Sequence, residues 1–222
     1  FLSLICGACT APQDTLLEQV DRLSTSTQND FYVSNRAPLQ PQQFIKLPAG
    51  TIQPEGWLKQ QLELQKEGLN GHLGEISAWL QKKDNAWLET GGQWGWEEVP
   101  YWLRGYANLA YIVEDNQMLN EAKFWIEGIL KSQREDGNFG PMHLNDGKQD
   151  FWPNMIVLWI MQSYYEYSND ERIIDFMTKY CNYLLTVPDE DFLYSYWENS
   201  RGGDNLWSVV WLYNHTGDKN LL

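Results

Sequence analysis

Basic residues are scarce in this sequence. Lys and Arg total 16 against 30 Asp and Glu, which gives a net charge of −14 at pH 7. A chain of this charge repels phosphate backbones and anionic lipid headgroups, so nucleic acid is not expected as a partner. A lyase that acts on uronic acids is disfavoured for the same reason.

Cysteines and long apolar runs are also few. The three cysteines do not form a disulfide framework, and Cys181 lies among apolar residues at helical spacing, as a buried small side chain would. After the first residues, no apolar run approaches the roughly 20 residues that a membrane-spanning helix needs. A disulfide-rich or membrane-embedded fold is therefore not expected.

The first nine residues have the pattern of an export signal. Residues 1–9 are apolar and end in Gly7 and Ala8 before Cys9, which is typical of a partial signal or lipoprotein leader. We therefore expect an exported bacterial protein, located in the periplasm or in the outer membrane as a lipoprotein. Contact with a membrane is expected only through a lipid on Cys9, and simple secretion is the alternative.

Residues 10–50 are rich in Gln, Ser, Thr, Asn and Pro, which predicts a polar tether followed by an extended segment. From residue 51 onward, apolar residues recur at helical spacing. Pro100 and Pro153 each open an apolar helix, and a more charged helix follows each one. The pattern predicts helical hairpins with an inner and an outer layer.

The hairpins repeat along the chain. The turn acids Asp115, Asp170 and Asp218 mark a period of about 50 residues, and the third copy is expected to begin at 202–204. Residues 51–222 are therefore predicted to form an all-α fold, an α/α six-hairpin toroid (barrel). Because the sequence stops at Leu222 within an apolar pattern, only about the first half of the barrel is expected here. An open solenoid and an ordinary helical bundle are the alternatives.

Aromatic and acidic residues gather in the segments that precede the predicted inner helices. In a ring of hairpins these segments converge on one rim, and the chain has 12 Trp. Sugars stack their C–H faces on aromatic rings and donate hydroxyl protons to carboxylates in a partly dry cleft. The candidate substrate-binding residues are Trp94, Trp96, Glu97, Glu98, His143, Asp150, Trp152, Trp197 and Asp204.

Some of these positions have a structural interpretation as well. Asp204 suits a helix cap, and Glu97 and Glu98 suit the first turn of a helix because the helix dipole favours acids there. Trp102 and Trp159 have the spacing of core residues. The lone His143 has no second ligand at metal-binding spacing, so no metal is expected in this chain.

Four motifs resemble successive elements of the β-L-arabinofuranosidase-like glycoside hydrolases, over about residues 55 to 222. They are Glu97-Glu-Val-Pro-Tyr-Trp-Leu-Arg-Gly105, Gln133-Arg-Glu-Asp-Gly-Asn-Phe-Gly140, Ser163-Tyr-Tyr-Glu-Tyr-Ser-Asn-Asp170 and Trp211-Leu-Tyr-Asn-His-Thr-Gly-Asp218. The resemblance implies an α/α six-hairpin barrel and hydrolysis of terminal arabinofuranosyl or related sugars from plant glycans. It also implies a catalytic glutamate and zinc-binding cysteines, one of them the nucleophile, beyond Leu222. Catalytic residues within this chain are therefore unknown, no cofactor is expected within it, and a two-carboxylate mechanism is the alternative.

We therefore expect an exported glycoside hydrolase that acts on an oligosaccharide or polysaccharide. A non-catalytic glycan-binding or scaffold protein on the same fold is the alternative, because a fold does not fix a function. The chain alone is expected to be inactive. It is also expected to be poorly soluble, because Leu206 and Val210 would be left uncovered.

Overall fold

The computed structural model describes residues 34–222 except 43, 143 and 146. This part of the chain is helical apart from a short hairpin in which β1 (Leu144–Asn145) pairs antiparallel with β2 (Lys148–Gln149). None of the helices described is both long and apolar enough to cross a membrane. The predicted all-α class is confirmed. The helices are α1 (Gly56–Glu67), α2 (Leu69–Ile76), η1 (Ala78–Leu80), α3 (Glu98–Val113), α4 (Asn116–Lys131), α5 (Trp152–Ser168), α6 (Arg172–Leu184), α7 (Tyr196–Thr216) and η2 (Lys219–Leu221).

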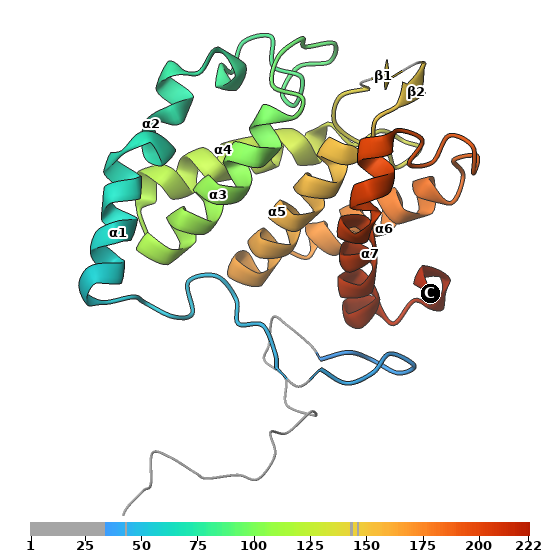
Figure 1. The fold of residues 1–222 in the computed structure, drawn as a ribbon, viewed down its shortest axis with the longest axis horizontal. Coiled ribbons are helices and arrows are strands. Elements are labelled where there is room, and N and C mark those ends of the chain that lie inside the picture. The colour runs from blue at the N-terminus through green and yellow to red at the C-terminus, as the bar shows by residue number, and fades with distance from the viewer. Residues whose placement is uncertain (1–33, 43, 143, 146) are drawn as a thin grey trace, which may run out of the picture.

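The helices form two layers of hairpins. The inner helices α3, α5 and α7 lie side by side and run in the same direction, and α4 and α6 return along their outer side (Figure 1). α5 packs between α3 and α7, so every residue from Trp152 to Glu166 except Trp159 is buried. α4 and α6 bury one apolar stripe each, which includes Ile126 and Met177. This arrangement is part of an α/α barrel, as predicted.

The predicted turn acids lie in the turns that join each inner helix to the helix that follows it, at one end of the layers. Asp115 accepts hydrogen bonds from the backbone N–H groups of Gln117 and Met118, both at 3.0 Å, and so caps α4. Asp170 and Asp218 accept the corresponding backbone N–H groups two residues on. The residue before each acid ends the preceding inner helix in the left-handed conformation: Glu114, Asn169 and Gly217.

α7 begins at Tyr196, six residues before the predicted start at 202–204. Ser195 caps it through a capping box, in which the Ser195 side chain accepts the Glu198 N–H at 3.3 Å and Glu198 Oε2 accepts the Ser195 N–H at 3.2 Å. Residues 202–203 therefore lie inside the helix, where each glycine costs only about 1 kcal/mol relative to alanine. The prediction that this repeat begins at 202–204 was wrong, and Asp204 is not a helix cap.

Residues 34–55 form no helix and run along the end of the layers opposite the inner-helix N-termini (Figure 1). The Arg36 backbone N–H donates to Asn214 Oδ1 at 3.0 Å, and the Arg36 side chain donates to the Asn214 carbonyl at 3.0 Å. Lys46 pairs with Glu166 at 2.7 Å. This part of the predicted tether is thus bound to α5 and α7. The predicted leader, with Cys9, lies outside the described residues.

Candidate functional site

The N-termini of the three inner helices lie at one edge of the inner layer (Figure 1). Each inner helix also turns one stripe of residues toward a shared surface, and neighbouring members of a stripe lie one or two helical turns apart. On α3 this stripe contains Glu97, the N-cap, followed by Tyr101 and Arg104, and on α5 it contains Trp152 and Trp159. We use the name inner groove for the face formed by these stripes and the facing residues of α7; the name denotes this face and not a cavity.

The upper level of the groove is organised around Trp152. Its Nε1–H donates to Glu97 Oε1 at 2.8 Å and to the Tyr101 hydroxyl at 3.2 Å, and the Tyr101 and Trp152 rings meet edge-on at 6.1 Å. The Glu97 side chain makes no capping hydrogen bond to α3, so the helix start does not account for its carboxylate. An acid from the first inner helix and an indole from the second are thus held together at the rim.

Arg201 on α7, the third inner helix, also contacts this upper level. Its guanidinium lies 4.2 Å from the centre of the Trp152 ring and 5.1 Å from that of Trp197, within range of cation–π attraction. Trp152 is only 9% exposed, so it positions its neighbours and offers little surface to a ligand. Trp197 and Tyr101 are 61% and 48% exposed and present aromatic surface to the groove.

A lower level repeats the pattern about 10 Å further along the helices, since seven residues span about two helical turns. The Arg104 guanidinium lies 4.2 Å from the centre of the Trp159 ring, and Trp159 stacks on Trp207 at 5.7 Å with 15° between the planes. Trp102 is buried in the core, as predicted. The same prediction was wrong for Trp159. It is the one residue of α5 between Trp152 and Glu166 that is not buried, and it faces the groove.

Two acids near the rim serve mainly to fix the backbone. Asp150 Oδ1 accepts the Trp152 N–H at 2.9 Å and so holds the first turn of α5. Glu198 is buried and its Oε1 accepts the Phe151 N–H at 2.6 Å, which ties the start of α5 to the start of α7. Glu198 was not among the predicted site residues, although its position three residues after Ser195 is the sequence signature of a capping box.

The other predicted residues are spread around the rim. Asp204 lies in α7 one turn after Arg201 and is half-buried, and Glu98 is half-buried with its Oε2 unpartnered among the described residues. Trp94 packs against Trp79 at 5.3 Å in the segment before α3. His143 lies outside the described residues.

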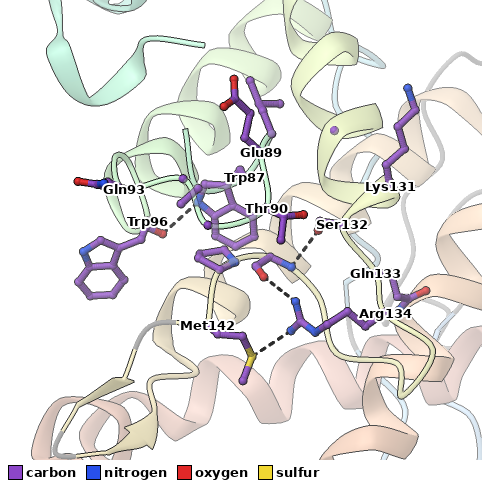
Figure 2. A pocket seen from close by; sticks show the side chains of 17 residues that line it. Trp87, Glu89, Thr90, Gln93, Trp96, Lys131, Ser132, Gln133, Arg134 and Met142 are labelled. Carbon is purple, nitrogen blue, oxygen red and sulfur yellow. Dashed lines mark hydrogen bonds between the residues drawn. The ribbon is translucent and has the colours of Figure 1, made fainter. Parts of the chain in front are cut away.

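Trp96 lines a different surface, a pocket of about 640 Å³ between the segments that precede α3 and α5 (Figure 2). The Trp96 indole points away from Arg134, and the Trp96 carbonyl accepts the Trp87 Nε1–H at 3.1 Å. Arg134 donates to the Gly140 carbonyl at 2.8 Å and to Met142 Sδ at 3.2 Å, so it holds the pocket wall together (Figure 2). Residue 96 thus faces the pocket while residue 97 faces the inner groove.

Residues 34–222, apart from the three gaps, contain no group of three His, Cys, Asp or Glu side chains that could hold a metal ion. Burial raises the pKa of the Cys181 thiol to about 12, so this cysteine is a neutral core group and not a thiolate ligand. Cys181 is therefore not a candidate ligand for a zinc ion.

Several groove residues were not predicted as site residues, because their role depends on contacts between helices. Sequence spacing does carry a signal for them, since Trp159 follows Trp152 by seven residues and Arg104 follows Glu97 by seven. The additional groove residues are Tyr101, Arg104, Trp159, Arg201 and Trp207.

Comparison with known proteins identifies the family. A family model described as β-L-arabinofuranosidase, GH127 catalytic domain, matches residues 17–222. Searches of curated proteins and of solved structures found no match. The match spans nearly the whole chain and includes all the groove residues. The chain therefore belongs to the GH127 β-L-arabinofuranosidase-like family of glycoside hydrolases.

Proposed function

We propose that this protein is an exported glycoside hydrolase that releases L-arabinofuranosyl residues from plant-type glycans. The family match supports hydrolysis of a glycosidic bond as the reaction. The apolar segment that ends at Cys9 supports export to the periplasm or attachment to the outer membrane by a lipid. The inner groove is the proposed place where the glycan binds.

The observation that carries the proposal is the position of Glu97 beside exposed aromatic rings. Trp152 fixes one carboxylate oxygen of Glu97, the Tyr101 ring meets the Trp152 ring edge-on, and Arg201 lies near both Trp152 and Trp197. A carboxylate has about four acceptor sites, so Glu97 can accept further hydrogen bonds from sugar hydroxyls. The rings can stack on the apolar face of the same sugar.

These residues bind and orient the sugar. Glu97 would set the direction of the hydroxyls, and the exposed rings would exclude water from one face of the sugar. Holding the glycosidic bond in a single orientation lowers the entropic part of the barrier to its cleavage. We assign no nucleophile and no general acid among the described residues.

The test is the hydrolysis of an aryl β-L-arabinofuranoside and of an arabinofuranosyl oligosaccharide by the whole protein and by Glu97→Gln. A hydrogen bond to a charged group contributes about 1.5–3 kcal/mol, so kcat/KM is expected to fall about 10- to 100-fold. The amide oxygen of the variant still accepts from Trp152, which keeps the rim in place.

The control is Trp57→Ala on α1, since Trp57 is 75% exposed and lies outside the groove. It is expected to leave both activities unchanged. Glycan binding without turnover by the wild-type protein would favour the alternative of a non-catalytic glycan-binding protein. An unchanged kcat/KM in Glu97→Gln would contradict the proposal that the glycan binds in the inner groove.

A further inference from the structure

Two arginines of the inner groove lie on tryptophan rings and have no acidic partner. Arg104 on α3 covers Trp159 and Arg201 on α7 covers Trp152, each at 4.2 Å from the ring centre. Within the described part of the chain, no carboxylate lies within ion-pair distance of either guanidinium.

Some basic side chains of the described chain pair with carboxylates. Arg172 binds both Glu127 and Asp170 at 2.6 Å. Four lysines also contact carboxylates at 2.7–3.5 Å: Lys46, Lys66, Lys82 and Lys148. Arg104 and Arg201 are not among these ion pairs, and each guanidinium lies on a tryptophan ring.

Stacking on a ring leaves the edge of a guanidinium available. The planar group places its N–H donors in a fixed fork, which matches the two oxygens of a carboxylate or a sulfate ester. Arg104 is exposed and Arg201 is half-buried, so both edges can be reached from the groove. Trp197 and Trp207 lie next to them and are 61% and 44% exposed, so a sugar ring can stack beside each arginine.

We propose that the glycan bound in the inner groove carries an anionic substituent, a carboxylate or a sulfate ester, and that Arg104 and Arg201 bind it. This inference rests on the proposed function, because it names the substrate class of the same groove. The two cations also give a physical reason why such a glycan can approach a chain of net charge −14, since they attract an anionic group locally.

The test measures binding of four oligosaccharides to the whole protein by titration calorimetry. They are an oligogalacturonide, its methyl ester, a sulfated galactan oligosaccharide and a neutral arabino-oligosaccharide. The proposal expects at least one acidic ligand to bind about tenfold or more tightly than its neutral counterpart, because charge-assisted hydrogen bonds are about twice as strong as neutral ones. The advantage should shrink as salt is added.

The variants are Arg104→Gln, Arg201→Gln and the double variant, with Arg→Lys at each position to keep the charge. The Gln variants should lose most of the acidic advantage, so that affinity for the acidic ligand falls more than affinity for the neutral arabino-oligosaccharide. Lys should restore part of this advantage, because a lysine keeps only the point charge. Lys59→Gln on the exposed surface of α1 removes the same charge outside the groove and should change nothing.

The outcomes separate the two proposals. Preference for the oligogalacturonide identifies a carboxylate, and preference for the galactan identifies a sulfate ester. Equal binding of acidic and neutral ligands, no binding of any acidic ligand, or an equal loss of both in the Gln variants would overturn the inference. The proposed function would survive each of these results if arabinofuranosides were still hydrolysed, and it would fail separately if they were not.

Discussion

The two ends of the inner helices differ in how their polar groups are used. At the end where α3, α5 and α7 finish, acids cap helices, Lys46 pairs with Glu166, and Arg36 binds the backbone of α7. At the end where these helices begin, Arg201 lies on Trp152, Trp152 donates to Glu97, and Tyr101 and Trp197 are exposed. The first end is held by contacts within the chain, which stabilise the fold. The second end has surface and hydrogen-bonding capacity for a ligand.

The largest expected effect on stability comes from Glu166→Ala at the closed end. Glu166 is buried, accepts the Trp211 Nε1–H at 3.1 Å and pairs with Lys46. Its loss leaves the indole N–H unpaired, so the free energy of unfolding should fall by about 3 kcal/mol. Denaturant unfolding measures the change, and KM for the glycan should stay as in the wild type. A glycan-binding defect without loss of stability would contradict the division between the two ends.

The closed end should also respond to pH through His215. Desolvation, with a smaller effect of Arg36, lowers the pKa of His215 to about 4, and its ring packs on Trp211 at 4.1 Å and Tyr165 at 5.1 Å. The unfolded chain binds the proton near pH 6.5 and the folded chain only near pH 4. The contribution of neutral His215 to the free energy of unfolding is therefore fully present above pH 6.5. It falls by on the order of 2 kcal/mol as the pH drops from 6.5 to 4.

Thermal melts between pH 7 and pH 4 test this prediction. His215→Gln should flatten the fall in Tm over that interval, whereas the same change at the exposed His72 should leave it intact. Identical pH profiles for the wild type and His215→Gln would show that this imidazole does not contribute to the pH dependence.

At the open end, Trp197→Ala should change binding and leave the fold intact. Trp197 is 61% exposed, so its removal should shift Tm by less than about 1 °C. Loss of one aromatic platform should weaken glycan binding about tenfold, since such contacts contribute about 1 kcal/mol or more. Trp57→Ala serves as the matched control, and an equal effect of both variants would argue against a groove-specific role.

The smallest effects are expected when equivalent acids at the two ends of the inner helices are replaced. Asp115 and Asp150 each accept backbone N–H groups at a helix start. Alanine at either position should cost about 1 kcal/mol of unfolding free energy. Only Asp150→Ala should also weaken glycan binding, because it loosens the turn that positions Trp152. Equal binding by the two variants would mean that the start of α5 is not part of the site.

The sequence allowed the repeated hairpins to be predicted because their signals are local. Asp115, Asp170 and Asp218 act within a few residues, and Pro153 opens α5 as expected. The start of α7 was misplaced because the glycines at 202–203 were interpreted as a break, although the capping box upstream had already started the helix.

The groove was predicted only in part, for a different physical reason. The predicted residues Trp152, Trp197 and Glu97 are aromatic or acidic side chains in loops or at helix starts. In the structure, Trp152 contacts Glu97, and Arg201 lies near both Trp152 and Trp197. Arg104 and Trp159 look like ordinary helix residues in the sequence. Their contact crosses from α3 to α5 and depends on helix packing, which a single sequence does not specify.

The central claim is that the glycan binds across the N-termini of α3, α5 and α7. A crystal structure of the whole protein with a bound arabinofuranosyl oligosaccharide tests it directly. We predict a sugar ring stacked on Trp197 or Tyr101 with a hydroxyl donating to Glu97. A sugar seated instead in the pocket beside Trp87 and Arg134, with the inner groove unchanged, would contradict the account.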